Sequence, residues 1–497
     1  MSTVRRISHW VDGRIVPGTS GNTGPVFDPA TGRQQAVVDL ASVAEADGVV
    51  AVAREASETW RGASLSQRTE VLFRLRELVV ANRKELASIV SAEHGKTVAD
   101  ALGEVARGLE NIEFACGIPA LLKGGYSEQV SSGVDVYSIR QPLGVVAGIT
   151  PFNFPAMVPM WMFAVALACG NTFVLKPSEK DPSASLFLAE LLKQSGLPDG
   201  CFNVLMGDRV AVDRLLAHPD VSAVSFVGST PIARYVYETG TQHGKRVQAL
   251  GGAKNHMLVL HDADLDQAAD AAVSAAYGSA GERCMAISVV VAVNSIADAL
   301  IDRIAQRIPG IKVGPASDTS SEMGPLITAE HRDRVLGYLT GATSEGARVV
   351  IDGRNGVPKE GFFVGPSLID GVRPGMACYD DEIFGPVLSV VRVASYDEGL
   401  ALINNNPFGN GTAIFTRDGG TARRFQNEVK VGMVGINVPI PVPVAYYSFG
   451  GWKASLFGDQ HIYGPDGVNF NTRQKVVTSR WPAPQTTSVD LGFPQTR

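Results

Sequence analysis

The sequence predicts an α/β protein with two parallel-sheet regions and a separate β-hairpin, and three observations support this prediction. Short apolar segments alternate with helical segments from Leu143 onward. A second series of the same kind begins near Gly251. Residues 126–141 instead alternate apolar and polar side chains, with a plausible turn at Ser132-Gly133. Because strands that alternate with helices form parallel sheets covered on both faces, we expect two such sheets and one hairpin outside them.

The individual elements are predicted from the spacing of apolar residues along the chain. Helical spacing predicts three early helices, at Ser42–Ala63, Leu65–Asn82 and Thr97–Cys116. Apolar runs predict strands of the first sheet at Val145–Thr150, Thr172–Leu175, Phe202–Met206 and Val221–Val227, with helices from about Ala156 and at Ser183–Gln194. The second sheet is predicted at Met257–Leu260, Ile287–Val293, Val387–Val393 and Thr412–Thr416, with helices at Ala297–Arg307 and Tyr396–Asn404. Near the end of the chain, Lys475–Thr478 again has strand character.

The composition excludes several classes of protein. The 497 residues include 44 Lys and Arg against 50 Asp and Glu, which gives a formal net charge of −6. A mildly acidic chain has no bulk electrostatic attraction to nucleic acid or to an anionic membrane. With 45% hydrophobic and 19% charged residues, the composition is that of a globular protein and not of a disordered one. We therefore expect a folded protein with no nucleic-acid partner and no membrane partner.

Cysteine and histidine are too scattered to indicate a disulfide framework or a metal site. None of the five cysteines pairs with another in a C-x-x-C motif, and the eight histidines show no H-E-x-x-H spacing. The N-terminus has no apolar segment typical of a signal peptide. The most apolar stretch, Met157–Cys169, is shorter than the ~20 residues that span a bilayer. We expect a cytoplasmic protein without a bound metal.

Cys284 is the first candidate for chemistry, in the segment Gly281-Glu-Arg-Cys-Met-Ala286. A lone cysteine is most often a small buried apolar residue. Here Arg283 precedes it, and a nearby cation favours the thiolate over the thiol. The apolar strand Ile287–Val293 follows, so the cysteine sits at the junction of a loop and an element, where active-site residues are common. These features indicate a nucleophile, with a buried structural cysteine as the alternative.

Asn153 is the second candidate, in Thr150-Pro-Phe-Asn-Phe-Pro155 at the end of the first parallel strand. The two prolines stiffen the loop, and the asparagine presents an amide donor at the carboxyl end of the sheet. Donors that are held in place before charge develops are suited to an oxyanion hole. An ordinary turn asparagine is the alternative.

Two further loops follow strands of the first predicted sheet and indicate a dinucleotide. Lys176 and Glu179 follow the second strand, where an acidic residue can bind ribose hydroxyls and a lysine can bind ribose or phosphate. Gly228 and Ser229 follow the fourth strand and open a helix, whose N-terminus can meet a phosphate. No G-x-G-x-x-G motif is present in these loops, so a plain strand–turn–helix cap is the alternative.

Taken together, these segments resemble the aldehyde dehydrogenase superfamily over nearly the whole chain. The matching motifs are Pro151-Phe-Asn-Phe-Pro155, Lys176-Pro-Ser-Glu179, Phe226-Val-Gly-Ser-Thr230, Leu250-Gly-Gly252, the loop around Cys284, Glu382-Ile-Phe-Gly-Pro386 and Gly435-Ile-Asn437. The resemblance implies Cys284 as the nucleophile and Asn153 as the oxyanion donor. It implies NAD as the cofactor, contacted by Phe152, Lys176, Glu179, Gly228, Ser229, Glu382 and Phe384.

The resemblance also assigns parts of the cofactor to particular residues. Glu382 would hold the ribose on the nicotinamide side, and Phe384 would lie against that end of the cofactor. Glu179 would favour NAD over NADP, because its charge would repel a 2′-phosphate.

One departure from the family changes the expected chemistry. Hydrolytic members carry a glutamate directly before Leu-Gly-Gly, and this glutamate activates the water that cleaves the thioester. Here the glycines place Ala249 at that position, whereas the ungapped distance to the cysteine places Leu250 there. Neither side chain can abstract a proton, so hydrolysis should be impaired. The chain is then a disabled enzyme, uses another carboxylate such as Glu282, or passes its acyl group to a thiol, which has a pKa near ~8.5.

The thiol alternative is similar to one branch of the family, the CoA-acylating methylmalonate-semialdehyde dehydrogenases. The similar segments are Gln248-Ala-Leu-Gly-Gly-Ala-Lys-Asn-His256 and Gly281-Glu-Arg-Cys-Met-Ala286. The resemblance implies coenzyme A as acceptor, and malonate or methylmalonate semialdehyde as substrate, with loss of carbon dioxide and formation of acetyl-CoA or propionyl-CoA. It also implies that Arg107 and Arg283 hold the substrate carboxylate, for which guanidinium groups are strong partners. The sequence does not decide whether the aldehyde comes from valine, inositol or β-alanine breakdown.

The expected architecture has two Rossmann-like parallel-sheet domains and an oligomerisation β-arm, as in the family. Residues 1–123 would be the N-terminal helical part of the cofactor-binding domain, 124–142 the oligomerisation hairpin, 143–250 the NAD-binding domain, 251–452 the catalytic domain, 453–470 the return to the cofactor-binding domain, and 471–497 the oligomerisation tail. The resemblance implies a homotetramer or a homodimer. Two rivals stay open: a hydrolytic NAD-dependent aldehyde dehydrogenase, and a non-catalytic structural protein on the same fold.

Overall fold

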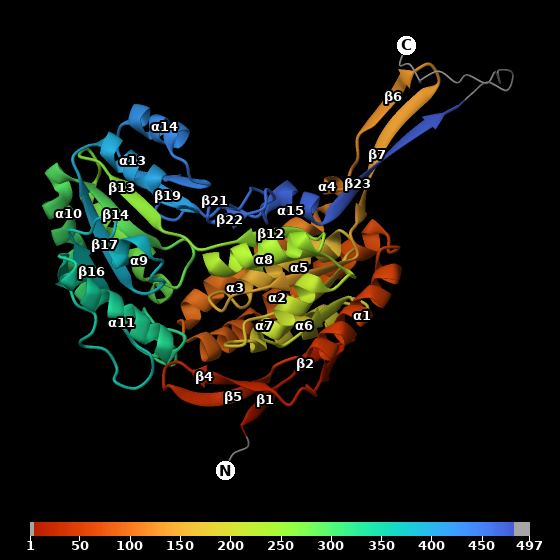
Figure 1. Cartoon of the computed structure of the whole chain (residues 1–497), viewed down its shortest axis with the longest axis horizontal. Helices are drawn as coiled ribbons and strands as arrows, with labels where there is room; N and C mark the ends of the chain where they lie inside the picture. The colour runs from red at the N-terminus through yellow and green to blue at the C-terminus, as the bar shows by residue number, and fades with distance from the viewer. Residues whose placement is uncertain (1–3, 482–497) are drawn as a thin grey trace.

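Two large sheets form the centre of the molecule, and a three-stranded arm projects away from them (Figure 1). The computed structural model describes residues 4–481. The order of the elements confirms the predicted α/β class, with two mainly parallel sheets and a separate β-arm.

The first sheet has eight strands, and its five central strands are parallel. Its edge strands are short and antiparallel to their neighbours. In spatial order the strands are β22 (Leu456–Phe457), β12 (Arg246–Leu250), β11 (Val221–Val227), β8 (Val145–Ile149), β9 (Thr172–Lys176), β10 (Phe202–Val204), β2 (His9–Val11) and β3 (Arg14–Val16).

Helices cover both faces of the first sheet, so its central strands are buried on both sides. In β8, Val145, Ala147 and Ile149 belong to one apolar core and Val146 belongs to the other. One core is completed by α2 (Leu65–His94), α3 (Val98–Cys116), α5 (Met157–Ala168) and α6 (Ser183–Gln194). The other is completed by α1 (Val43–Trp60), α7 (Arg209–Ala217) and α8 (Thr230–Gln242). Two-sided burial explains why these strands are continuous apolar runs in the sequence.

The second sheet has seven strands, and it shares one apolar core with the helices packed against it. Only its edge strand β15 runs antiparallel to its neighbour. The order is β15 (Arg348–Ile351), β16 (Ser367–Asp370), β17 (Val387–Val393), β14 (Ile287–Val293), β13 (Asn255–Val259), β19 (Gly411–Phe415) and β20 (Met433–Ile436). The helices that surround it are α9 (Leu265–Tyr277), α10 (Asn294–Arg307), α11 (Ala329–Ser344), α12 (Ala377–Asp380), α13 (Tyr396–Asn405) and α14 (Gly419–Glu428).

The N-terminal segment differs from the expected helical part. Residues before Val43 form five strands, and the helices begin only after them. Two of these strands are β2 and β3 at the edge of the first sheet, and the others form a small sheet of β1 (Arg5–Ile7), β5 (Arg33–Asp39) and β4 (Thr23–Asp28). Three of the five strands have only three residues, which is too short for an alternating pattern to be recognised.

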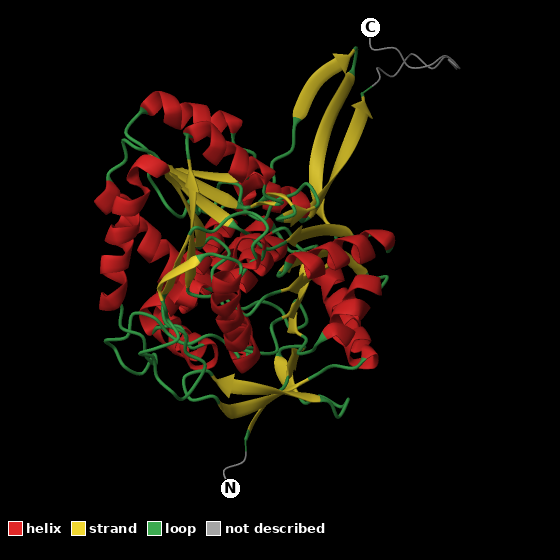
Figure 2. Ribbon diagram, turned by 60° about the vertical axis from the view of Figure 1, so that its left-hand side comes forward, coloured by secondary structure: helices red, strands yellow, loops and turns green. Residues whose placement is uncertain are grey.

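The arm joins the predicted hairpin to the C-terminal strand. β6 (Tyr126–Ser131) and β7 (Val134–Pro142) are antiparallel and are connected at Ser132-Gly133, where Gly133 has a φ of +69°. β23 (Thr472–Arg480) pairs with the whole length of β7. Figure 2 shows these three strands leaving the body of the molecule together. The end of the predicted oligomerisation tail, residues 482–497, lies outside the described residues, and the oligomerising role of the arm stays a prediction.

Helix boundaries follow local capping more closely than apolar spacing. Ser42 caps α1 in a reciprocal bond pair with Glu45, which fixes its start. α2 was expected to end at Asn82 but continues to His94, where Gly95 ends it with a φ of +91°. The expected end was early because residues 83–85 are polar and exposed, although buried apolar residues resume after them. Remaining short elements are α4 (Ile118–Leu121), α15 (Gly464–Phe470), β18 (Phe408–Gly409) and β21 (Trp452–Lys453).

Within residues 4–481, the structure contains no helix with the length and apolar character that a membrane crossing needs.

A glycine in the central strand β8 offers a test of the packing. A Cβ at Gly148 would lie 2.5 Å from the buried ring of Phe173 and 3.1 Å from the sulfur of Met162. We expect Gly148→Ala to lower the free energy of unfolding by ~1–3 kcal/mol through overpacking. Gly48, in the exposed part of α1, has no atom within 4 Å of such a Cβ, so Gly48→Ala should raise stability by up to ~1 kcal/mol. Urea unfolding measures both changes, and equal effects would contradict the packing described for β8.

Candidate active site

A strained turn precedes Cys284 and fixes where the cysteine lies. Ser279 and Ala280 in the 3-10 turn Gly278–Gly281 both have a φ of +51°, and Gly281 follows with a φ of +75°. Left-handed backbone is costly for residues other than glycine and persists only where surrounding structure enforces it. A Cβ on Gly281 would lie 2.2 Å from the carbonyl oxygen of Gly385. The turn is therefore pressed against the segment that carries Glu382 and Phe384.

Two asparagines hold the backbone of Cys284 from the second sheet. The Nδ2 group of Asn255, on β13, donates to the Cys284 carbonyl at 2.9 Å and to the Ala286 carbonyl at 2.8 Å. The Nδ2 group of Asn410, just before β19, donates to the same Cys284 carbonyl at 3.1 Å. The cysteine is thus fixed at its own backbone, which limits how far its sulfur can move.

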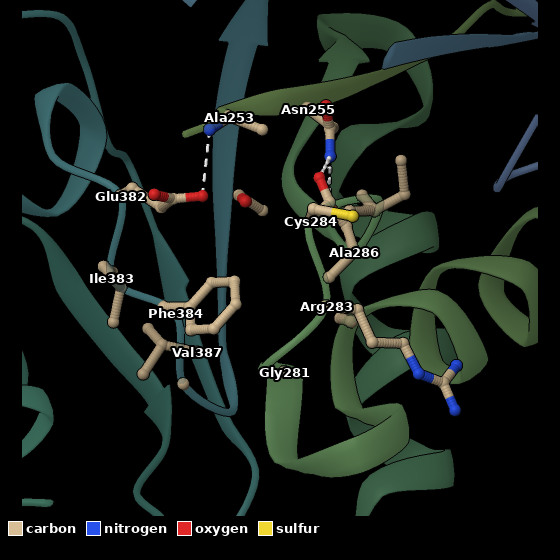
Figure 3. Close-up of a pocket in the computed structure, with 14 residues that line it drawn as sticks. Ala253, Asn255, Gly281, Arg283, Cys284, Ala286, Glu382, Ile383, Phe384 and Val387 are labelled. Carbon is tan, nitrogen blue, oxygen red and sulfur yellow. Dashed lines mark hydrogen bonds between the residues drawn. The ribbon is translucent and has the colours of Figure 1, made fainter. Parts of the chain in front are cut away.

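Cys284 lines a cavity that it shares with Glu382 and Phe384 (Figure 3). The sulfur comes from the loop before β14, and the other two side chains come from the loop before β17. The fourteen lining residues are Ala253, Asn255, Ala276, Gly281, Arg283, Cys284, Ala286, Ile287, Ser288, Glu382, Ile383, Phe384, Gly385 and Val387. Among them, Glu382 carries the one carboxylate.

Glu382 is held close to the link between the two sheets. Its Oε1 accepts a hydrogen bond from the Ala253 backbone N–H at 2.9 Å, as Figure 3 shows. A Cβ on Gly252 would lie 2.3 Å from Oε2 of Glu382, so a glycine is needed there for this close approach. Burial raises the pKa of Glu382 to about 7, against the opposing effect of the Ala253 hydrogen bond. Around neutral pH this carboxyl is therefore close to half protonated.

Phe384 and Phe152 face each other across the two halves of the site. Their rings meet edge to face at 5.9 Å between centroids. Phe384 has a φ of +57°, and its carbonyl oxygen lies 2.6 Å from Nε2 of His331. Because a carbonyl can only accept, Nε2 of His331 must carry the proton of this bond. This bond from α11 supports the strained backbone of Phe384.

Asn153 reaches the cysteine loop through its amide. Its Nδ2 donates to the carbonyl oxygen of Glu282, two residues before Cys284, at 2.9 Å. The residue is 4% exposed and is not among those that line the cavity. An amide nitrogen has two hydrogens, so one remains for a further acceptor. The structure thus brings Asn153 next to the cysteine loop.

Arg283 favours the thiolate of Cys284, as expected, but it does not set the charge state of the cysteine. Burial, followed by the nearby Glu382 carboxylate, raises the pKa of the Cys284 thiol to about 12, and the opposing effect of Arg283 is smaller. The Arg283 guanidinium forms an ion pair with Asp100 on α3. Cys284 therefore rests as a neutral thiol.

Arg107 lies on the same helix as Asp100 and is also paired. Its guanidinium contacts both oxygens of Glu110, at 2.9 and 3.1 Å. Cys284 and Arg107 are both within electrostatic range of Tyr463, whose pKa is raised mainly by burial. The two predicted carboxylate-binding arginines thus sit on or against α3, each with a carboxylate partner of the chain.

The predicted cofactor residues of the first sheet lie at the carboxyl ends of its strands. Lys176 ends β9, and its Nζ is 3.1 Å from the Glu179 carboxylate. Burial alone would raise the pKa of Glu179, but the charge and hydrogen bond of Lys176, a backbone hydrogen bond and the charge of Lys180 together outweigh burial and lower that pKa. Gly228 follows β11, and its N–H donates to the Leu250 carbonyl at 3.1 Å. Ser229 precedes α8 with an exposed side chain that makes no capping hydrogen bond.

The structure separates the two candidates for the missing base. Leu250 belongs to the apolar core against which Cys284 packs, whereas Ala249 belongs to the core on the opposite face of the sheet. Both residues are buried, at 4% and 0% exposure. Leu250 is therefore the residue on the side of the cysteine.

Several residues of the site had no signal of their own in the sequence. Asn255 lies in a segment that the motif comparison quoted, but nothing gave it a role, and Asn410 lies in no motif. His331 and Asp100 are polar or charged residues of helices, and the spacing of apolar residues alone would place them on the solvent-exposed face. Lys96, between α2 and α3, and Glu104, on α3, are likewise charged residues without a motif, and the structure buries both side chains completely beneath Asn153.

Removing the charge of Glu382 should change the reactivity of Cys284. Because the Glu382 carboxylate raises the thiol pKa, Glu382→Gln should lower it and speed alkylation by iodoacetamide about 3–10-fold above pH 7, where Glu382 is ionised. Below pH 7 the two proteins should converge. Asp380→Asn, an exposed acid on α12 outside the cavity, is the matched control. Cys284→Ala gives the background from the other four cysteines, which are buried. Equal rates at pH 8–9 would contradict this coupling.

Comparison with known proteins places this arrangement in a family. A sequence profile of the aldehyde dehydrogenase family matches residues 15–477. Malonate-semialdehyde dehydrogenase of Pseudomonas aeruginosa is 54% identical over 480 residues, which covers 96% of this chain and 96% of the relative. Malonate-semialdehyde dehydrogenase 2 of Geobacillus kaustophilus is 48% identical and covers 96% of this chain and 99% of the relative.

Two solved structures superimpose over almost the whole chain. Methylmalonate-semialdehyde dehydrogenase from Oceanimonas doudoroffii is 53% identical with a TM-score of 0.95, covering 96% of this chain and 99% of that chain. A structure from Sinorhizobium meliloti 1021, provisionally assigned as methylmalonate-semialdehyde dehydrogenase and complexed with NAD, is 52% identical with a TM-score of 0.96, covering 98% and 100%. From the profile match, the identities and the shared fold, the chain belongs to the aldehyde dehydrogenase family.

Proposed function

We propose that the chain oxidises malonate semialdehyde or methylmalonate semialdehyde with NAD and passes the acyl group to coenzyme A. Carbon dioxide is lost, and acetyl-CoA or propionyl-CoA is formed. The observation that carries the proposal is the apolar side chain of Leu250 on the cysteine side of the first sheet, where a hydrolytic member would need a base. The names of the similar proteins from P. aeruginosa and O. doudoroffii point to the same two substrates.

Cys284 is the proposed nucleophile and Asn153 the proposed oxyanion donor. The sulfur attacks the aldehyde carbon, and the carbonyl oxygen takes the negative charge. The free N–H of the Asn153 amide would donate to that oxygen, while its other N–H stays on the Glu282 carbonyl. A donor fixed in this way needs no reorganisation as charge develops. Because the resting thiol is neutral, the proton must leave Cys284 before or during the attack.

The residues around the first sheet fit a dinucleotide. Ser229 offers an unbonded hydroxyl at the start of α8, and helix N-termini favour phosphate. Lys176 and Glu179 supply a cation and an anion at the end of β9, and Glu382 has an oxygen besides the one held by Ala253. We propose that these residues, with Gly228, Phe152 and Phe384, hold NAD. When bound there, NAD supplies the hydride acceptor that turns the cysteine adduct into a thioester.

The thioester would be released by a thiol. Leu250 cannot take a proton from water, and Glu282 is completely buried and does not line the cavity. Its carboxyl interacts with the Ile327 N–H, and burial raises the pKa of Glu282 to about 8. A thiol near a pKa of ~8.5 ionises far more readily than water. Coenzyme A can therefore attack the thioester carbonyl, with Cys284 thiolate as the leaving group.

Loss of carbon dioxide precedes transfer in this scheme. The β-carboxylate leaves with its bonding electrons moving into the thioester carbonyl, which accepts them as an enolate. Protonation then gives the shorter acyl group. Arg107 and Arg283 are the proposed partners of the carboxylate before it leaves, because guanidinium groups bind carboxylates in a forked geometry. The substrate must share these arginines with Glu110 and Asp100.

The proposal extends to assembly and location. We expect the arm of β6, β7 and β23 to pair with another copy in a homodimer or homotetramer, since its long edge strands leave backbone groups available for pairing. We also expect the protein in the cytoplasm.

The acceptor is tested by turnover with and without coenzyme A. Without a thiol, malonate semialdehyde should give a burst of about one NADH per active site and then a slow rate, because neither Leu250 nor the buried Glu282 activates water. Coenzyme A should restore full turnover and yield an acyl-CoA. Leu250→Glu should raise thiol-independent acid formation above that of the uncharged control Leu250→Gln, by at most ~10²–10⁴-fold. An equal wild-type rate without thiol, with free acid as the product, would support the hydrolytic alternative instead.

Substrate recognition is tested by removing the arginines. Arg107→Leu and Arg283→Leu should reduce kcat/KM for malonate semialdehyde far more than for propanal, which has no carboxylate, since a charge-assisted contact contributes roughly 1.5–3 kcal/mol. Arg303→Leu, on α10 in the other half of the molecule, is the control and should change neither. Equal losses on both aldehydes would show that the arginines act on the cysteine or on the fold, and not on the carboxylate.

A further inference from the structure

A completely buried ion pair lies beneath the loop that carries Asn153. Lys96 stands between α2 and α3, and Glu104 lies on α3. Their side chains are both 0% exposed, and Nζ is 2.8 Å from Oε2. Neither residue lines the cavity of Cys284.

All other polar contacts of this pair end on one short segment, residues 153–157. Lys96 Nζ donates to the backbone carbonyl of Asn153 at 2.6 Å and lies 4.4 Å from the centre of the Phe154 ring. Glu104 Oε1 accepts from the backbone N–H of Ala156 at 2.8 Å and of Met157 at 3.1 Å. Lys96 therefore holds the start of the segment and Glu104 holds its end.

The segment cannot provide these bonds itself. Pro155 has no N–H to donate, and the N-cap residue of α5 is Ala156, whose side chain cannot cap the helix that begins at Met157. The Glu104 carboxylate replaces the missing cap from a different helix and sits at the favourable, positive end of α5. The Asn153 carbonyl would otherwise be a buried acceptor without a partner, which proteins avoid.

Stability alone does not account for such a pair. Two buried charges pay a large desolvation cost, and well-packed apolar residues are often as stable or more so. A buried ion pair whose hydrogen bonds are all formed instead holds the groups that it contacts in one fixed geometry. Here those groups are the backbone of Asn153 and the first turn of α5, while the Asn153 amide is held separately by Glu282.

We infer that Lys96 and Glu104 act as positioning residues that hold Asn153 at the distance and angle its amide needs to receive the oxyanion. The inference rests on the proposed role of Asn153. A displacement of about 1 Å at a catalytic group can cost ~10²-fold in rate. Loss of the pair should therefore slow the step in which the oxyanion forms, without changing how NAD binds.

The test is a double-mutant cycle on the NADH burst, recorded by stopped-flow absorbance with saturating substrate and no coenzyme A. Lys96→Met and Glu104→Gln should each lower the burst rate constant ~10–100-fold, with the KM for NAD unchanged. In an Asn153→Ala background, which itself should lose ~10²–10³-fold, the same changes should cost less than about 3-fold, because residues that act through one group are not additive.

Two further results separate positioning from general damage. Arg392→Met removes an ion pair with Asp370 in the second sheet and should leave the burst unchanged. Circular dichroism and thermal unfolding report folding, and Glu104→Gln, which keeps the size of the side chain, carries the test if Lys96→Met does not fold. The inference would be overturned if Lys96→Met and Glu104→Gln lowered the burst rate constant by the same factor in the Asn153→Ala background as in the wild type. A wild-type burst in both Lys96→Met and Glu104→Gln would also overturn it. A wild-type burst in Asn153→Ala would instead contradict the oxyanion role of Asn153.

Discussion

One face of α3 is the constraint on which the rest of the site depends. Asp100, Glu104, Arg107 and Asn111 follow one another at helical spacing. Asp100 pairs with Arg283 beside the nucleophile, and Glu104 completes the start of α5. Asn111 donates to the Arg107 carbonyl and interacts with Tyr463. A shift or rotation of this helix would move the loop of Asn153, both arginines and the tyrosine together, so the packing of α3 against α2 and α5 sets the geometry of the site.

Burial sets the charge state of the site as firmly as packing sets its shape. The pKa values of Cys284, Glu382 and Glu282 are all raised because charged forms are poorly solvated there. At neutral pH the cysteine is a thiol and Glu382 is near its midpoint. A negatively charged substrate therefore meets little repulsion from the cysteine, while the arginines supply the positive charge. As the proposed nucleophile, Cys284 must therefore lose its proton during the reaction, through contacts that form with substrate and cofactor.

The groups proposed to react could be chosen from the sequence, whereas the residues that support them could not. Cys284, Asn153 and Glu382 stand in motifs of fixed spacing, and parallel strands bring loops that follow them to one edge of a sheet. Lys96 and Glu104 are 57 and 49 residues from Asn153 and look like ordinary charged residues of a helical region. Similarly, three of the strands before Val43 have only three residues, and one of these, β2, pairs with β10, which lies more than a hundred residues away. The sequence shows Arg283 next to Cys284, whereas Asp100, Glu382 and the burial that raises the pKa of the thiol are visible only in three dimensions.

The apolar residue at Leu250 and the buried state of Glu282 have a common consequence for the choice of acceptor. Water needs a base because its proton is held far more tightly than that of a thiol. In the proposed scheme Leu250 and the buried Glu282 supply no base, and Glu382, the one carboxylate of the cavity, is engaged by NAD. Such a site slows hydrolysis strongly but slows attack by a thiol much less, since part of the thiol ionises without help. In the proposed scheme, selectivity for coenzyme A does not require tight binding of the acceptor. This selectivity follows from the lack of a base that could activate water. In addition, the leaving group of the thioester is the Cys284 thiolate, and Asn255 and Asn410 hold the backbone of this cysteine in place.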